Sequence, residues 1–508
     1  MRSAYLPTAL FAQAFFAAAA PTPYSPDGLT VQTNAGPVSG FYNQTAPNVR
    51  QFLGIPFAQP PVEDLRFAPP QPAQLRSSTL NATAFGPSCM QKTSAAKTIY
   101  TERVPQFLIS GGQSEDCLYL NVWAPEVSAS EKAPLPVFIY IPGGGFTSGG
   151  ANSVYKFPDQ WIQRTQSHIV VIINYRVNVF GFPNAAGLED SNVGLLDQRL
   201  AVEWTRDNIA SFGGDPDRIT LWGQSAGAAS SNVYAYAYPE DPIISSFISD
   251  SGSATIAGSQ DYSHTNFTAL AGLVNCTNAD AAAELACMRS VPASSLENVL
   301  STYNATPALT FTPLWDNKTA FSNTTERALR GLVAKIPGIL GSNTNEGAGF
   351  VPWSENGPGE ATLRAVTQSV IACPVGVEVS NRQLVGLPTY RYQYAGNFSN
   401  VSPASWMGAY HSSDLPLLFG THFQYRGQST FYEYEVSQFM EALWLSFASN
   451  PTAGPKIANG FAWPQFNASS DTMVQFASGT TKVQLVSGQI IDSNCSGIVV
   501  APRGGAPA

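Results

Sequence analysis

A serine between two glycines is the clearest candidate for chemistry in this chain of 508 residues. Ser225 lies in Gly223-Gln-Ser-Ala-Gly227, after a predicted strand at 218–222 and before the small residues Ala228-Ala-Ser230. Glycines on both sides of a serine allow a tight turn between strand and helix that leaves the hydroxyl exposed. The pentapeptide alone is a weak signal, but its position after a strand makes it a strong prediction of a nucleophile.

A second glycine cluster, Gly143-Gly-Gly-Phe146, follows the apolar run 136–141. It matches neither G-x-x-x-x-G-K-S/T nor G-x-G-x-x-G, which disfavours phosphate binding. Backbone N–H groups of such a loop, together with the N–H of Ala226, can converge on the oxyanion that forms when a carbonyl group is attacked. The order of the two motifs therefore favours acyl transfer.

A serine hydroxyl needs a base, and histidine is the usual base near neutral pH. Of the four histidines, His168 precedes the serine and His264 lies in a polar stretch. After a serine in such a turn, the acid and then the histidine follow along the chain. This order leaves His411 and His422 as alternatives, with His411 favoured, and it leaves acids such as Glu346 between serine and base.

Strands and helices alternate around these motifs. Residues 136–141 and 169–174 are short, continuously apolar runs, typical of parallel strands buried on both faces. Apolar residues recur with helical spacing over 194–210, before Gly213-Gly-Asp-Pro216 breaks the pattern. We therefore predict an α/β fold, with a central, mostly parallel sheet flanked by helices, in one large catalytic domain over 21–508 that contains insertions.

Composition narrows the class of partner. The chain has 26 Lys and Arg against 35 Asp and Glu, a net charge of −9 and a pI near 5.0. With no basic cluster, this balance argues against nucleic acid and anionic membranes as partners. Hydrophobic residues, at 44%, suffice for a large core, whereas only 12% are charged, about half the usual share. We expect attached sugar to help keep the surface soluble.

The first residues predict secretion. Met1-Arg-Ser3 carries a positive charge, and the largely apolar stretch 6–20 ends in an alanine run before Pro21. This order indicates a secretory signal peptide over residues 1–20. A transmembrane anchor is not expected, because the stretch is shorter than the ~20 apolar residues of a span and contains Pro7 and Gln13. The sequence favours no particular oligomeric state.

Two further features agree with an oxidising, extracellular compartment. Glycan acceptors in N-x-S/T triplets are expected at Asn43, Asn81, Asn266, Asn275, Asn304, Asn317, Asn323, Asn397, Asn400, Asn467 and Asn494. The six cysteines form an even set that predicts disulfides, with fifteen pairings open. Because no C-x-x-C pair exists and histidines are few, we expect no metal site.

Several segments together resemble one family. They are Phe52-Leu-Gly-Ile-Pro-Phe57, Leu65-Arg-Phe67, Ser114-Glu-Asp-Cys-Leu-Tyr-Leu-Asn121, Asn174-Tyr-Arg-Val177, Asn192-Val-Gly-Leu-Leu-Asp-Gln-Arg199, Phe212-Gly-Gly-Asp-Pro216 and Asp250-Ser-Gly-Ser253. With the serine motif, they are similar to the type B carboxylesterases, the cholinesterase-like branch of the α/β-hydrolases that includes fungal esterases and lipases. The resemblance extends over residues 28–495.

The resemblance assigns catalytic roles. The family's acid lies in a G-x-N-x-x-E-G segment, which Gly341-Ser-Asn-Thr-Asn-Glu-Gly347 matches, and its base lies in a segment like Tyr410-His-Ser-Ser-Asp-Leu415. It thus implies a triad of Ser225, Glu346 and His411. It also implies that the oxyanion is bound by the backbone N–H groups of Gly144, Gly145 and Ala226.

The resemblance also implies covalent and ionic ties. By analogy, the disulfides are Cys89–Cys117, Cys276–Cys287 and Cys373–Cys495. The pairs Arg66–Glu115 and Arg176–Asp197 are similar to structural ion pairs of the family and are not expected to be catalytic.

The expected chemistry is hydrolysis of a small carboxylic ester through an acyl-enzyme, without cofactor or metal. Phe107 stands where the choline-binding tryptophan of cholinesterases would be, and Gln224 replaces the glutamate before their serine, so choline esters are not expected to be preferred. Phe146, Phe350 and Trp353 could line an apolar substrate pocket or belong to the ordinary core.

Two other functions stay open. A lipase acting on long-chain acylglycerols or sterol esters would use the loop between Cys89 and Cys117 as an amphipathic flap. A non-catalytic adhesion or binding protein could share the scaffold, but such relatives typically lose the serine, which is present here.

Overall fold

The computed structural model describes residues 28–498, apart from 93–95, 127–132, 256–259 and 459. The expected signal peptide at 1–20 lies outside these residues. Within the described ranges, no helix has the length and apolar character needed to cross a membrane.

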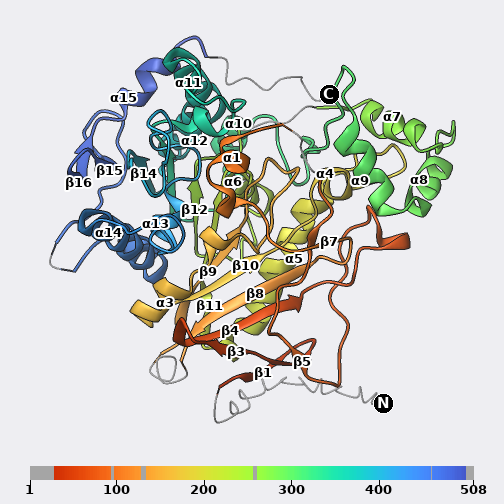
Figure 1. Cartoon of the computed structure of the whole chain (residues 1–508), viewed down its shortest axis with the longest axis horizontal. Helices are drawn as coiled ribbons and strands as arrows, with labels where there is room; N and C mark the ends of the chain where they lie inside the picture. Colours follow the sequence, from red (N-terminus) through yellow and green to blue (C-terminus); the bar gives the residue numbers. More distant parts are fainter. Residues whose placement is uncertain (1–27, 93–95, 127–132, 256–259, 459, 499–508) are drawn as a thin grey trace, which may run out of the picture.

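An eleven-stranded sheet forms the centre of the molecule (Figure 1). Its strands, in spatial order, are β16 (Thr481–Val486), β15 (Met473–Ser478), β14 (Thr389–Tyr394), β13 (Gly338–Asn343), β12 (Ser246–Asp250), β11 (Gly214–Gln224), β9 (Leu135–Ile141), β10 (Ile169–Ile173), β8 (Tyr119–Pro125), β4 (Ala46–Pro56) and β3 (Phe41–Asn43). The strands from β15 to β10 pair in parallel, and only the flanking pairs are antiparallel. This confirms the predicted mostly parallel sheet.

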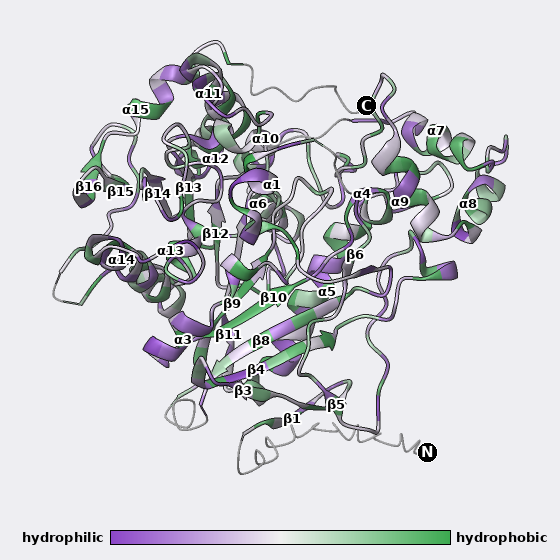
Figure 2. Ribbon diagram, viewed as in Figure 1, coloured by the Kyte–Doolittle hydropathy of each residue, from purple (hydrophilic) through white to green (hydrophobic). Residues whose placement is uncertain are grey.

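The two faces of the sheet pack against different helices. Val137, Ile139 and Ile141 of β9 join a core with the helices α5 (Val193–Asn208), α6 (Ala226–Ala237) and α12 (Cys373–Leu384). Phe138 and Tyr140 of the same strand point to the opposite face, into a core with α3 (Asp159–Thr165), α13 (Leu415–Leu418) and α14 (Phe431–Ser449). Burial on both faces explains why the central strands are continuously apolar, as the hydropathy colours of Figure 2 show for β9 and β10.

A third, smaller core lies outside the sheet. It is formed by α7 (Thr265–Leu273), α8 (Ala281–Ser290) and α9 (Ala293–Thr302), which are grouped at the upper right of Figure 1. The remaining elements are β1 (Thr30–Thr33), β2 (Gly36–Ser39), β5 (Leu80–Asn81), β6 (Ser88–Cys89), β7 (Gln113–Ser114), α1 (Ile99–Glu102), α4 (Asn178–Gly181), α10 (Thr324–Leu329), α11 (Glu360–Val366) and α15 (Gln489–Asp492).

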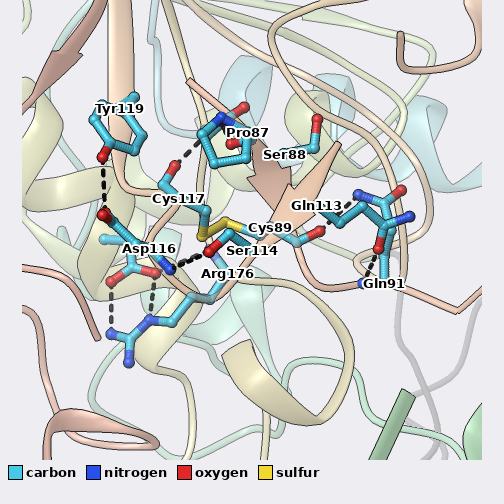
Figure 3. Close-up of a disulfide and its surroundings, with 12 residues drawn as sticks. Pro87, Ser88, Cys89, Gln91, Gln113, Ser114, Asp116, Cys117, Tyr119 and Arg176 are labelled. Carbon is cyan, nitrogen blue, oxygen red and sulfur yellow. Dashed lines mark hydrogen bonds and ion pairs between the residues drawn. A yellow bond between two sulfur atoms is a disulfide. The ribbon is translucent and has the colours of Figure 1, made fainter. Parts of the chain in front are cut away.

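The six cysteines pair as Cys89–Cys117, Cys276–Cys287 and Cys373–Cys495, the pairing that the resemblance implied. The first disulfide ties β6 to the segment before β8 and closes the loop that carries α1 (Figure 3). Next to it, the Tyr119 hydroxyl donates to Asp116 at 2.9 Å.

Both expected ion pairs also form, and they differ in exposure. Arg66 and Glu115 make two hydrogen bonds of 2.6 Å. Arg176 and Asp197 are bidentate at 2.7 and 2.8 Å, with side chains 3% and 0% exposed. The second pair connects the segment after β10 to α5, so it fixes a helix against the sheet.

Exposure separates one of the eleven glycan acceptors from the others. Asn43 and Asn266 are half-buried, and Asn81, Asn275, Asn304, Asn317, Asn323, Asn397, Asn467 and Asn494 are exposed. Asn400 is buried, and its Nδ2, the atom to which a glycan would attach, has two N–H groups that face three acceptors within 3.0 Å, His422 O, Ser429 Oγ and Glu433 Oε1. A glycan on Asn400 would break this network, so we expect this acceptor to be unoccupied in the folded protein.

Candidate active site

Ser225 lies in a strained turn between β11 and α6. Its backbone has φ 59° and ψ −122°, a conformation that non-glycine residues rarely adopt. Both flanking positions must be glycine, because any side chain would clash with the backbone. A Cβ on Gly223 would lie 2.1 Å from Gly227 O, and one on Gly227 would lie 1.9 Å from Ile141 O. The Ser225 N–H donates to Asp250 O at 2.9 Å, which ties the turn to β12.

The glycine loop after β9 reaches the serine directly. A Cβ on Gly143 would lie 2.9 Å from Ser225 Cβ, and Gly144 and Gly145 have φ of 130° and 62°. The Gly144 carbonyl accepts from the N–H groups of Thr147 and Ser148, which closes the loop into a compact turn. Within the described part of the chain, the N–H groups of Gly144, Gly145 and Ala226 donate no hydrogen bond, so they are free to bind an anion.

His411 and Glu346 are in contact, as the resemblance implied. His411 Nδ1 lies 2.6 Å from Glu346 Oε2, and the Glu346 side chain is fully buried. The other oxygen, Oε1, accepts from the backbone N–H of Asn343 at 2.6 Å. Both carboxylate oxygens therefore accept, and the proton between the two side chains belongs to the imidazole.

The second ring nitrogen of His411 faces Gln224. The distance from His411 Nε2 to Gln224 Nε2 is 3.0 Å, and the described hydrogen bonds include none between Ser225 and His411. Because Nδ1 donates to Glu346, Nε2 carries a lone pair and accepts from the Gln224 amide. This tautomer is the one that a general base for Ser225 needs.

The loop closed by the first disulfide packs against this site. In helix α1, the Tyr100 hydroxyl donates to His411 O at 2.7 Å. Lys97 O accepts from Trp353 N at 3.0 Å, and Arg103 pairs with Glu355 at 2.5 Å. These contacts hold α1 to both segments that carry the histidine and the glutamate.

The three aromatic residues that were candidates for a pocket have different surroundings. Phe350, 41% exposed, packs on the His411 ring with centroids 4.4 Å apart. Phe146 is buried against Phe182 at 5.5 Å. Trp353 packs on Trp406 at 5.5 Å, and the guanidinium of Arg103 covers its ring. Of the three, only Phe350 has a described ring contact with a residue of the expected triad, His411.

The other histidines have separate roles in the structure. His168 is buried against Trp161 at 4.2 Å, and burial lowers its pKa to about 3, so it stays neutral. His422, the alternative base, instead contacts Ser429 at 2.6 Å and Glu433 at 3.3 Å.

Sequence reasoning missed three contributors to this site. Gln224 was considered only as a replaced glutamate, although its position next to the serine was a signal. Asn343 is the asparagine of the G-x-N-x-x-E-G segment, so the motif itself could have indicated it. Tyr100 gave no signal, because the loop that brings it to His411 is 311 residues away in the sequence.

Comparison with known proteins gives consistent matches over most of the chain. The model of the carboxylesterase family matches residues 27–361 and 355–490. A chlorogenic acid esterase of Aspergillus niger is 57% identical, covering 92% of this chain and 94% of that protein. Secreted lipase 5 of Gibberella zeae is 39% identical, with the same coverage, and an acetylcholinesterase of Bungarus fasciatus is 29% identical over 88% of this chain and 82% of its own.

Proposed function

The chain belongs to the carboxylesterase family of α/β-hydrolases, and we propose that this carboxylic-ester hydrolase acts through Ser225, His411 and Glu346. The observation that supports the triad best is the 2.6 Å contact between His411 Nδ1 and the buried Glu346, next to a serine in a strained turn. Glu346 fixes the ring tautomer whose Nε2 lone pair can take a proton.

The steps follow from these groups. His411 Nε2 removes the Ser225 proton while Oγ attacks the ester carbonyl, and Glu346 stabilises the imidazolium that forms. His411 then gives the proton to the leaving alkoxide, which departs as the alcohol. Water, deprotonated by the same nitrogen, attacks the acyl-enzyme; as the bond to Ser225 Oγ breaks, His411 returns the proton to Oγ, and the acid is released with the enzyme restored. For the first step, Nε2 must exchange its hydrogen bond with Gln224 for one with the serine.

The oxyanion is bound, in this proposal, by the N–H groups of Gly144, Gly145 and Ala226. None of the three donates a hydrogen bond to another residue in the ranges that the structure describes, and the loop lies in contact range of Ser225. Preorganised donors of this kind contribute about 3–4 kcal/mol each to transition-state stabilisation in comparable hydrolases.

For the substrate, we propose an ester with an aromatic acyl group. The relative from Aspergillus niger is named for chlorogenic acid, a caffeoyl ester. The exposed ring of Phe350, packed on His411 at an interplanar angle of 43°, gives an aromatic acyl group an apolar surface next to the reacting carbonyl.

We also propose that the enzyme is secreted and glycosylated. A signal pattern at residues 1–20, three disulfides and exposed acceptor asparagines support this, as do relatives named as secreted. Disulfides of this kind persist in oxidising compartments.

The first test is hydrolysis of chlorogenic acid beside p-nitrophenyl esters from acetate to palmitate. Ser225→Ala should lower kcat about 10⁴-fold or more, whereas Ser405→Ala, at an exposed serine, should not change it. Activity retained in Ser225→Ala would refute the triad.

The substrate series also separates the alternatives. Preference for chlorogenic acid over the acetate ester would support the aromatic acyl group. A maximum at palmitate that rises at an emulsion interface would favour a lipase, as in the Gibberella relative. Failure of a fluorophosphonate to label Ser225 in the folded protein would favour a non-catalytic role.

A further inference from the structure

Two aspartates lie buried together behind the proposed triad. Asp250 ends β12, and Asp414 immediately precedes α13; both side chains are fully buried. Because the Asp250 carbonyl accepts the N–H of Ser225, this pair begins directly under the nucleophile.

A tyrosine joins the two carboxyl groups. The Tyr392 hydroxyl, on β14, lies 2.8 Å from Asp250 Oδ1 and 3.3 Å from Asp414 Oδ2. A phenol has one proton and can donate it to only one of these oxygens. The other contact is a hydrogen bond only if that carboxyl group carries a proton and donates it to the phenol oxygen. Both contacts are satisfied when the two aspartates hold one proton between them.

The other partners indicate which aspartate holds this proton. Besides Tyr392, Asp414 has two hydrogen-bond donors, Asn343 Nδ2 at 3.1 Å from Oδ1 and its own backbone; of the charges nearby, Glu346 disfavours its ionised form and His411 favours it. The Asp250 carboxyl is bonded, besides Tyr392, to the indole N–H of Trp222 at Oδ2. The ionised form is therefore better supported on Asp414, and the proton belongs on Asp250 Oδ1.

The electrostatic surroundings agree with this assignment. Among the described residues, the titratable groups that interact with the pair are Tyr100 on α1, Tyr140 on β9, Tyr392 and Tyr394 on β14, Glu346 after β13, and His411. Burial and then the charge of Asp414 raise the pKa of Asp250 well above its usual value. Burial raises the pKa of Asp414 less, to about 6. Like charges this close in a buried space do not ionise together.

We propose that Asp250 stays un-ionised at neutral pH and donates a hydrogen bond through Tyr392 to the Asp414 carboxylate, as a positioning residue for Glu346 and His411. The connection is Asn343, whose side chain donates to Asp414 and whose backbone N–H donates to Glu346 Oε1. Of the two aspartates, only Asp414 is then charged, so His411 faces one negative charge from this pair and not two. The proposed effect on catalysis rests on the triad proposed above.

The direct test is infrared spectroscopy of the whole protein labelled with ¹³C at the aspartate carboxyl carbons. At pH 8, wild type should show the C=O band of an un-ionised aspartic acid, and Asp250→Asn should lose it. Tyr392→Phe, which removes the acceptor, should move the band to higher frequency. No such band in wild type, or a band retained in Asp250→Asn, would overturn the proposal. This readout needs no catalysis, so it separates the proposal from the triad.

The second test is the pH dependence of kcat/KM. In Asp250→Asn an amide replaces a neutral carboxyl group, so the midpoint of the acid limb should stay within about 0.3 pH units of wild type. In Asp414→Asn the imidazolium of His411 loses a neighbouring negative charge, so the midpoint should fall by about one pH unit or more. Equal downward shifts in the two variants would show that Asp250 is charged and would overturn the proposal. If Asp250→Asn does not fold, the wild-type spectrum and Tyr392→Phe decide.

Discussion

Replacing Glu346 by glutamine tests the proposed role of this residue without removing any atoms from the site. Glu346 accepts from two donors, His411 Nδ1–H and the Asn343 N–H, each at 2.6 Å. A glutamine has only one oxygen. If that oxygen stays with Asn343, the amide N–H group faces His411 Nδ1, which must then accept, and the ring proton moves to Nε2. A protonated Nε2 cannot take the proton of Ser225.

The alternative orientation of the glutamine is disfavoured. It would place an amide N–H group against the backbone N–H of Asn343 and leave a buried donor unpaired, which costs about 1–3 kcal/mol. This cost corresponds to a population ratio of about 5- to 150-fold in favour of the tautomer with the proton on Nε2, which cannot act as a base for Ser225. The lost negative charge also destabilises the imidazolium, and the analogous Asp→Asn change in a serine protease lowers kcat about 10⁴-fold.

We therefore expect Glu346→Gln to lower kcat for p-nitrophenyl acetate about 10⁴-fold, with KM changed little. Its unfolding free energy should stay within about 1 kcal/mol of wild type, because the glutamine keeps both hydrogen bonds and the Gln224 amide can turn to accept from Nε2–H with its oxygen. Glu360→Gln is the matched control, an exposed glutamate nearby in the sequence, and should retain activity. A kcat for Glu346→Gln within tenfold of wild type would refute the tautomer argument.

Three further predictions concern other parts of the molecule. Gln224→Glu places a carboxylate about 3.0 Å from His411 Nε2 and should stabilise the protonated ring, so the acid limb of kcat/KM should move to higher pH; a shift to lower pH would contradict this. Glycopeptide mass spectrometry should find Asn397, which is exposed, occupied and Asn400 unoccupied; a glycan on Asn400 would show that this region folds differently. Asp197→Asn leaves a buried guanidinium without its charge partner and should lower the unfolding free energy, measured with urea, by about 3–5 kcal/mol, and a loss below 1 kcal/mol would show that the site takes up water.

Much of the fold could be predicted from the sequence because the pattern is local. The strands β9 and β10 are buried on both faces, so their apolar runs are unbroken. The expected break at 213–216 is shorter in the structure, where only Gly213 precedes β11, and β11 contains Pro216 and begins before the predicted strand at 218–222. The Ser225 turn is also local, since two glycines and the strand before them determine it.

The parts of the site that could not be predicted depend on contacts between residues that are distant in the sequence. The residues alone could not rank the acids, and resemblance nominated Glu346. Gln224 meets His411 across 187 positions, and Tyr100 meets it across 311, so no spacing rule reaches them. The triplet around Asn400 satisfies the glycan pattern, but only the fold shows that the side chain is buried. Trp353 is a large aromatic residue of the kind that lines substrate pockets, but in the structure its ring packs against Trp406 and under the guanidinium of Arg103.

The disulfide between Cys373 and Cys495 has a consequence for survival among proteases. It joins two residues 122 positions apart, and the segment between them carries His411 and the strands β14, β15 and β16. A single peptide bond cut in the stretch 424–428 would leave His411 on the N-terminal fragment with Ser225, and the disulfide would keep the C-terminal fragment, with α14, β15 and β16, covalently attached to it. If the enzyme is secreted, as proposed above, one cut by an extracellular peptidase between these cysteines leaves the chain in one covalent piece.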